Sequence, residues 1–327
     1  MKIAGWNPYF SNYFHLTKHG SVTSNWGLGP EVREYKIKSL HNVNIHVNHY
    51  GVNSLNLYSF YAKKSKSVNI FQHYEVMNLM IGGSETFQHF IIDLLPILFA
   101  CRTFLIANPN IPILLLAPNK EFLERNFYFD LLGLKNELIN IHNDEYINCE
   151  TMYFIDFKPH RAQYLNHTPS WNALSQFLAT NKVMTNSEYN RKTLTFIRRN
   201  SSTRKISNED EVIDFIHKMA FIYNLNVKVV NSSDYTRLQI YRIMQNTQIA
   251  ISVHGGQGLN ILGMEPNSIF IEFIPTKGTD TLGNIAHALN LKYLAIPVNY
   301  SKSDQSFEIP KNILAELEKF NLLNTSF

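Results

Sequence analysis

The segment from Ile249 to Pro275, IAISVHGGQGLNILGMEPNSIFIEFIP, places a glycine-rich turn between two apolar runs. Ile249–Val253 is short and rich in β-branched residues, which predicts a buried parallel strand. Three glycines in the four positions after His254 permit a sharp turn that a ligand can approach without meeting Cβ atoms. Leu259–Met264 predicts the first turns of a helix, whose free N–H groups point back to the turn and suit a phosphate. The same glycines also fit an ordinary turn.

Two further features bring charge to this predicted site. Glu272 is the one charged residue of the next predicted strand, Ile269–Ile274, and a buried carboxylate is costly without a partner, so it is a candidate ligand contact. Another predicted strand, Leu194–Ile197, leads into four cations within eight residues, namely Arg198, Arg199, Arg204 and Lys205. A solvated charge run is the usual interpretation. Open α/β sheets, however, bind ligands at the carboxyl ends of their strands, and arginine pairs well with phosphate.

The order of the predicted elements indicates an α/β fold with parallel sheets. The second half alternates strands and helices, with strands at 194–197, 227–230, 249–253, 269–274 and 293–298, and helices from 208 and at 235–245, 281–289 and 310–322. Asn208 and Glu211 predict a capping-box start for the first of these helices. In the first half we expect antiparallel strands at 42–47 and 54–58, parallel strands at 111–117 and 152–157, and helices at 85–96 and 119–132. Pro96 is expected to kink the helix at 85–96.

Length and composition favour a globular protein of two domains. The chain has 327 residues, 45% of them hydrophobic and 17% charged, which excludes a disordered chain. The net charge of +4 is modest and scattered, which disfavours nucleic acid as a partner. Cys101 and Cys149 lack a metal-ligand spacing, so we expect free thiols, no structural zinc and a reducing compartment.

The sequence carries no membrane signal that we recognise. The N-terminal MKIAGWNPYFSNYF is polar and aromatic where a signal peptide is apolar. The longest apolar run, from Phe90 to Ile106, is interrupted by Asp93, Pro96 and Arg102. We therefore expect a cytoplasmic protein with at most peripheral membrane contact.

His89 and Asp93 are a candidate acid–base pair. They lie four residues apart in a predicted helix, so they share one face. An imidazole with a carboxylate partner is suited to act as a general base near neutral pH. The spacing also fits an ordinary hydrogen-bonded pair at the edge of a core helix.

Three blocks, in order between residues 80 and 300, resemble those of glycosyltransferase family 61. The first has the sense H-(W/F)-x-x-(D/E)-x-x-P, and this chain reads His89-Phe-Ile-Ile-Asp93-Leu-Leu-Pro96. The second is a strand ending in a double arginine, then a basic loop and N-E-(D/E), matched here by Arg198-Arg199, Arg204 and Asn208-Glu209-Asp210. The third is H-G-A-G-L-x-N followed by a V-I-E-(L/F)-x-P strand, matched by residues 254–260 and 271–275. Gln257 departs from this block, because it stands where the family has its second glycine.

This resemblance implies a GT-B architecture, in which two Rossmann-like domains face each other across a cleft. We expect an acceptor-side domain at 1–185 and a nucleotide-sugar-binding domain at 186–304, and we allow for the C-terminal helix at 305–327 packing back on the first domain. The resemblance also implies inverting transfer of a sugar from a nucleotide-diphosphate donor, of the UDP type, to a hydroxyl of a glycan or glycoconjugate, as in polysaccharide biosynthesis. We expect no cofactor and no obligate metal, and the sequence has no D-x-D at a strand end.

The resemblance also implies roles for individual residues. The diphosphate is expected to bind Arg198, Arg199 and Arg204 and the N–H groups of Gly255 and Gly256, in a donor site that includes Asn208 and His254. Glu272 is expected to take the ribose hydroxyls, Asn260 to support the loop, and His89 with Asp93 to activate the acceptor. Two alternatives remain open, namely a polysaccharide pyruvyl-type transferase, which needs no ribose-binding Glu272, and a non-catalytic glycan-binding relative.

Overall fold

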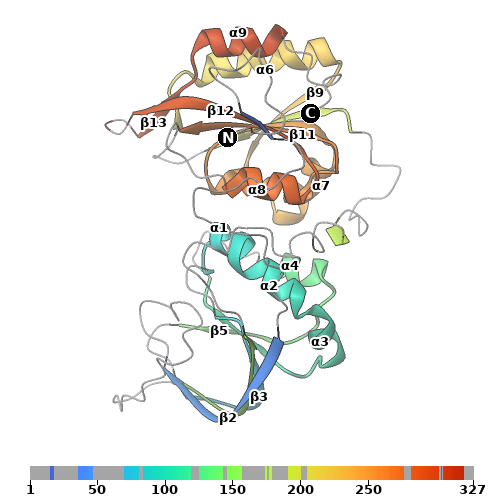
Figure 1. Ribbon diagram of the computed structural model, residues 1–327, viewed down its shortest axis with the longest axis vertical. Coiled ribbons are helices and arrows are strands. Elements are labelled where there is room, and N and C mark those ends of the chain that lie inside the picture. The colour runs from blue at the N-terminus through green and yellow to red at the C-terminus, as the bar shows by residue number, and fades with distance from the viewer. Residues whose placement is uncertain are drawn as a thin grey trace. The chain divides into compact units, whose positions relative to one another are not determined.

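A computed structural model of the chain describes residues 15–17, 36–46, 70–80, 84–118, 125–142, 146–156, 174, 177–178, 191–199, 205–275, 281–301, 303 and 305–319. The chain forms two compact units (Figure 1). The N-terminal unit is Glu31–Ser170, and the C-terminal unit combines Met1–Pro30 with Trp171–Phe327. Within the first 30 residues the structure describes the strand His15–Thr17, which pairs with a strand of the C-terminal unit, whereas we expected this segment in a domain at 1–185.

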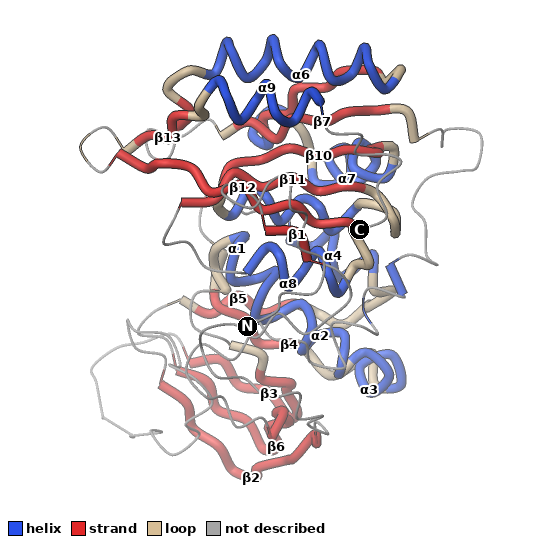
Figure 2. Tube along the Cα trace, turned by 45° about the horizontal axis from the view of Figure 1, so that its top comes forward, coloured by secondary structure: helices blue, strands red, loops and turns tan. Residues whose placement is uncertain are grey.

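The C-terminal unit is built on a single large sheet. Its described strands are β1 (His15–Thr17), β7 (Thr193–Arg198), β8 (Lys205–Ile206), β9 (Asn226–Asn231), β10 (Thr247–Val253), β11 (Ile269–Pro275), β12 (Lys292–Ser301) and β13 (Ser306–Glu308). The parallel strands follow the order β9-β7-β10-β11-β12, and β10, β11 and β12 are seen side by side in Figure 2. The direction of strand addition reverses between β7 and β10, which makes this pair the topological switch point where such sheets bind ligands.

Helices cover both faces of this sheet. They are α6 (Glu209–Tyr223), η5 (Ser232–Asp234), α7 (Arg237–Gln245), η6 (Gly256–Gly263), α8 (Thr281–Ala288) and α9 (Lys311–Lys319). Figure 1 shows α6 and α9 on one face, with α7 and α8 on the other. The apolar residues of α6 that recur at helical spacing are all buried, as the periodicity predicts: Val212, Phe215, Ile216, Met219 and Ala220.

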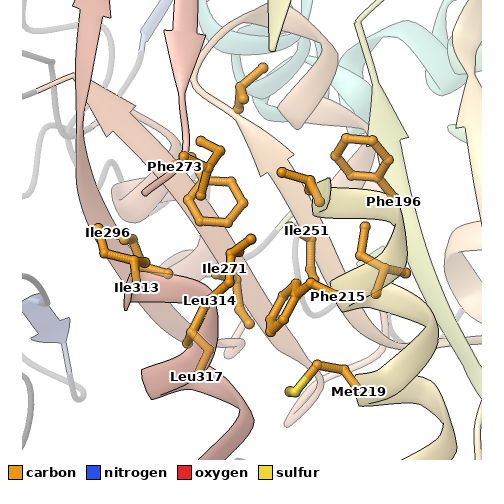
Figure 3. Packing of buried hydrophobic residues seen from close by; sticks show 14 of the residues in the cluster. Phe196, Phe215, Met219, Ile251, Ile271, Phe273, Ile296, Ile313, Leu314 and Leu317 are labelled. Atoms are coloured by element: carbon orange, nitrogen blue, oxygen red, sulfur yellow. The ribbon is translucent and has the colours of Figure 1, made fainter. Parts of the chain in front are cut away.

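The main hydrophobic core lies between the sheet and the α6–α9 layer. Phe215 of α6 and Leu314 of α9 pack over Ile251 and Ile271 of the central strands (Figure 3). All four side chains are less than a tenth exposed. Helix α9 therefore packs within the C-terminal unit, and the expectation that it packs back on the N-terminal domain is corrected.

The N-terminal unit contains a second, mixed sheet. Its strands are β2 (Lys36–His46), β3 (Ile70–Asn78), β4 (Ile113–Leu116), β5 (Leu138–Ile141) and β6 (Tyr146–Asp156), in the order β2-β6-β3-β4-β5. Only β2 is antiparallel among the described strands of this sheet. The α/β class with parallel sheets is thus confirmed. The antiparallel strand expected at 42–47 is part of β2, and the one expected at 54–58 lies outside the described residues.

One face of this second sheet carries the helices α1 (Phe87–His89), η3 (Phe90–Leu94), α2 (Leu95–Ala100), α3 (Arg102–Ala107) and α4 (Asn126–Leu131) (Figure 1). A π-helical turn at Phe90–Leu94 lies directly before α2, which contains Pro96, and the kink expected at Pro96 stays a prediction. Pro96 falls at the second position of α2, where an N–H would have no partner within that helix. Among the described helices, none is both long and apolar enough to cross a membrane.

The two cysteines are free and buried, as expected from their spacing. Burial raises the pKa of Cys149 to about 11 and raises the pKa of Cys101 further. Because the thiolate is the reactive form, both side chains behave as small apolar residues of the N-terminal unit.

Candidate functional site

The glycine loop lies at the switch point of the C-terminal sheet. It leaves β10 at His254 and Gly255 and enters η6 at Gly256. Gly255 has φ 145°, a backbone conformation that favours glycine. The N–H groups of Gly255, Gly256 and Gln257 make no hydrogen bond to another described residue. Successive unengaged N–H groups of this kind form a site for an anion.

Two other glycines let η6 pack closely against its neighbours. A Cβ on Gly258 would lie 2.4 Å from Leu282 Cδ1 of α8, and one on Gly263 would lie 2.9 Å from the carbonyl oxygen of Tyr241 in α7. The helix expected from Leu259 is present as a 3-10 helix, and it begins earlier, at Gly256. The close packing holds the glycine loop between α7 and α8.

His254 is held by two groups of the neighbouring strand β11. Its Nδ1 lies 2.6 Å from Oε1 of Glu272 on β11, and its backbone N–H donates to the Phe273 carbonyl oxygen at 2.8 Å. Tyr293 on β12 donates its hydroxyl to Oε2 of Glu272 at 2.5 Å. Glu272 has no exposed surface, whereas the His254 side chain is 16% exposed. The carboxylate of Glu272 is thus buried behind the His254 ring, and its expected contact with ribose stays a prediction.

Sequence reasoning missed Tyr293, because its position next to Glu272 follows from the register of β11 and β12. Glu272 pairs with Ala295, and Phe270 pairs with Tyr293, in the parallel register of β11 and β12. Positions two apart on a strand share a face, so Tyr293 is a diagonal neighbour of Glu272. A buried carboxylate needs a donor, and tyrosine is the residue on that face that supplies one.

The arginine segment follows β7 at the same edge of the sheet. Arg198 donates from Nε and from one terminal nitrogen to Oε2 of Glu209, at 2.9 and 2.5 Å. This hydrogen bond is the main reason that the pKa of Arg198 is raised above its ordinary value. Arg198 is 48% exposed, so its other nitrogen edge remains accessible to a ligand. Arg199 is the next residue at this edge, and Arg204 lies outside the described residues.

Asn208 joins two parts of the C-terminal unit. Its amide nitrogen donates to the Ile309 carbonyl oxygen at 2.8 Å and to Oε2 of Glu211 at 3.1 Å. Its oxygen accepts from the Ile309 N–H at 3.0 Å. The side chain makes no capping bond to α6, so the predicted capping box is wrong. We assign Asn208 to this structural contact and leave it out of the donor site proposed below.

Asn260 lies beneath the glycine loop and contacts its backbone. It donates to the Gln257 carbonyl oxygen at 2.7 Å and to the Ser232 hydroxyl at 3.2 Å. Its own oxygen accepts from Arg237 at 3.4 Å. Ser232 follows β9 and Arg237 begins α7, so both come from the same edge of the sheet. Neither residue was anticipated, because neither lies in a recognisable motif.

The predicted His89–Asp93 pair is present in the N-terminal unit. Nδ1 of His89 lies 2.8 Å from Oδ2 of Asp93, and the two side chains are 51% and 8% exposed. The Thr86 side chain caps the turn that carries His89, and Asp93 lies in the π-helical turn that follows. The hydrogen bond that His89 donates to Asp93 raises the pKa of His89. Burial opposes this, and the charges of Asp93 and Glu85 add to it.

A doubly wound parallel sheet with a glycine-rich loop at its switch point is typical of α/β proteins that bind a ligand at this edge. Comparison with protein-family models narrows the class. Residues 87–271 match the family described as Glycosyltransferase 61, so the chain belongs to this family. This match includes the His89–Asp93 pair, the arginine segment and the glycine loop.

One curated relative is similar over part of its length. A protein from Arabidopsis thaliana named xylan glycosyltransferase MUCI21 is 31% identical over 100 residues. The aligned part is 30% of this chain and 19% of the relative, so the similarity spans less than a fifth of that protein.

Proposed function

We propose that this protein is a glycosyltransferase that moves a sugar from a nucleoside-diphosphate donor, of the UDP type, to a hydroxyl of a glycan or glycoconjugate. Transfer inverts the anomeric configuration and needs no divalent metal. The observation that carries this proposal is the open N–H array at Gly255, Gly256 and Gln257, at the switch point of a family 61 chain. We further propose a GT-B architecture, with the donor on the C-terminal unit.

The donor chemistry follows from where charge develops. As the acceptor hydroxyl attacks the anomeric carbon, negative charge builds on the departing diphosphate. Fixed dipoles and cations aimed at that charge often supply the largest catalytic contribution. In the proposed site the loop N–H groups bind one phosphate. Arg198 and Arg199 neutralise the negative charge of both phosphates. Arg198 keeps Glu209 on one side of its guanidinium and offers the other side to the ligand.

His254 has a specific role in this proposal. Because Glu272 accepts at Nδ1, the imidazole is held in one orientation. When both ring nitrogens carry a hydrogen, the second one, Nε2, donates to the leaving diphosphate. Glu272 and Tyr293 are positioning residues in this scheme, since they act on the donor through His254.

We place the acceptor base on the N-terminal unit. Nδ1 of His89 donates to Asp93, which leaves Nε2 as the basic nitrogen of the neutral ring. Nε2 removes the proton from the acceptor hydroxyl, and Asp93 stabilises the imidazolium that forms. A polysaccharide acceptor is favoured because a relative carries the name xylan glycosyltransferase.

The test is a transfer assay with a panel of UDP-sugars and glycan acceptors that includes xylo-oligosaccharides, run in EDTA. We expect at least one pair to give a product whose anomeric configuration, read by proton NMR, is opposite to that of the donor. A product of retained configuration, or transfer that requires added Mg²⁺ or Mn²⁺, would contradict the mechanism. Pyruvyl transfer is checked in the same panel with phosphoenolpyruvate as donor.

A further inference from the structure

The hydrogen bonds beneath the glycine loop form a chain in which the donor and acceptor of each bond are fixed by the bond before it. Arg237 has donors and no acceptor, so the oxygen of Asn260 must face it and the Asn260 nitrogen must face the other way. That nitrogen donates to the Ser232 hydroxyl and to the Gln257 carbonyl oxygen. Ser232, which is 3% exposed, therefore donates its own hydroxyl hydrogen to a further acceptor.

The proton of Ser232 is accepted by the side-chain oxygen of Gln257. The orientation of the Gln257 amide is thereby set, and its nitrogen, Nε2, is directed away from Ser232. Nε2 makes no hydrogen bond to another described residue. Gln257 is half-buried in the loop, directly after the N–H groups of Gly255 and Gly256. Its two amide hydrogens are thus additional donors at the anion site.

We propose that Gln257 is a donor-binding residue, whose amide nitrogen donates hydrogen bonds to the diphosphate of the nucleotide. This rests on the function proposed above. A glycine at this position would offer only its backbone N–H, so Gln257 adds a side-chain contact. Ser232 and Asn260 are positioning residues, because they hold the amide oxygen and leave the nitrogen for the ligand. The chain of bonds from Arg237 polarises each donor in turn.

The experiment titrates UDP calorimetrically into the full chain and four variants, in EDTA. Gln257→Glu keeps an oxygen for Ser232 but removes both amide hydrogens. Because a lost hydrogen bond to a charged group raises the Kd about 10- to 100-fold, we expect a change of this size for UDP. Ser232→Ala frees the amide to rotate, so we expect a smaller loss. Gln257→Ala removes the donors without adding charge and should also weaken UDP about tenfold or more.

Gln239→Glu is the matched control, because Gln239 accepts from the Thr236 N–H through its oxygen and a glutamate can do the same. It adds the same charge to the same unit, so its UDP affinity should stay near that of the unaltered protein. Unchanged affinity in both Gln257 variants, with UDP bound by the unaltered protein, would overturn this inference alone. Equal weakening in Gln239→Glu and Gln257→Glu, with Gln257→Ala unaffected, would overturn it in favour of a general charge effect. Failure of the unaltered protein to bind any nucleoside diphosphate would overturn the proposed function and this inference together.

Discussion

Nδ1 of His254 lies 2.6 Å from Oε1 of Glu272, a carboxylate without exposed surface. The other oxygen of this carboxylate accepts the hydroxyl of Tyr293. A buried carboxylate is stable only when hydrogen bonds satisfy its oxygens, and here a half-buried imidazole at the loop supplies one of them. The loop that we propose to bind the diphosphate is thereby tied to the interior of the sheet.

Replacing Tyr293 with phenylalanine should destabilise the fold. The substitution leaves Oε2 of Glu272 buried without the tyrosine donor, a loss of about 1–3 kcal/mol in the free energy of unfolding. Tyr300→Phe is the control, because it lies on the same strand and its hydroxyl makes no hydrogen bond to another described residue. Urea denaturation measures both variants. Equal stability of the two variants would mean that the Tyr293–Glu272 bond contributes nothing.

Adding a methyl group at Gly283 should disturb the same site from α8. A Cβ there would lie 2.6 Å from Cε1 of the Tyr293 ring, closer than two carbons can approach. The ring must shift, so Gly283→Ala should lower the free energy of unfolding by about 1–3 kcal/mol and weaken UDP binding. Ala286→Gly, a change of the same size on the same helix, should lower stability by about 1 kcal/mol and leave UDP binding intact. Unchanged UDP affinity in a folded Gly283→Ala protein would show that the position of the Tyr293 ring does not affect donor binding.

The rate of transfer should depend on the protonation of His89. Its pKa is raised above 6.5, chiefly by the hydrogen bond to Asp93, and a base must be neutral to accept a proton. The acidic limb of the kcat–pH profile should therefore lie above pH 6.5 and move down in Asp93→Asn. Glu85→Gln should move the limb less, since its charge is the smallest of the contributions. If the acidic limb of the kcat–pH profile lies at the same pH in Asp93→Asn, His89 is not the group whose ionisation controls the rate.

The same pKa shift makes a prediction for stability. A raised pKa in the folded state stabilises the fold below the pKa of the unfolded chain, and this contribution is lost as the pH rises through the folded value. The difference in unfolding temperature between the unaltered protein and Asp93→Asn should therefore be larger at pH 5.5 than at pH 8.5. A difference that does not change with pH would indicate that the pair is not ionised as described.

Removing the His89 side chain should lower kcat and leave UDP binding intact. General-base catalysis typically contributes about 10²–10⁴-fold, so His89→Ala should lose activity on that order. Asp93→Asn should lose less if Asp93 only orients and polarises the ring. A purely structural pair would instead lower the unfolding temperature of both variants, with activity falling only with the folded fraction. Measuring kcat, UDP affinity and melting on the same proteins separates these outcomes.

The parallel sheet of the C-terminal unit was predictable because its strands are apolar runs separated by helices of clear periodicity. Strands β10 and β11 and the buried face of α6 follow this pattern closely. Strand β5, with the sequence LINI, was missed because it is only four residues long and contains the polar Asn140. Strand β13 was missed because it is also short and contains polar residues, and its edge pairing with β12 is set by tertiary contacts.

The site was predictable only where its residues are close in sequence. His89 and Asp93 were paired correctly from a spacing of four. The partners of Arg198 and Glu272 were not foreseen, since Glu209 is 11 residues from Arg198 and Tyr293 is 21 residues from Glu272. Ser232 and Gln257 are 25 residues apart and meet only because β9 and β10 end at one edge. Such contacts follow from sheet order and register, which periodicity alone does not specify.

The central claim, that this edge of the sheet binds a nucleoside diphosphate without a metal, is tested most directly by titrating UDP into the unaltered protein and Arg198→Ala in EDTA. Lys311→Ala is the matched control, because Lys311 forms an exposed ion pair with Glu211 in the same unit, as Arg198 does with Glu209. We predict that UDP binds the unaltered protein and Lys311→Ala alike, and binds Arg198→Ala about 10- to 100-fold more weakly at an unchanged unfolding temperature. Equal affinity of all three proteins for UDP, or binding that appears only with an added divalent cation, would contradict the account.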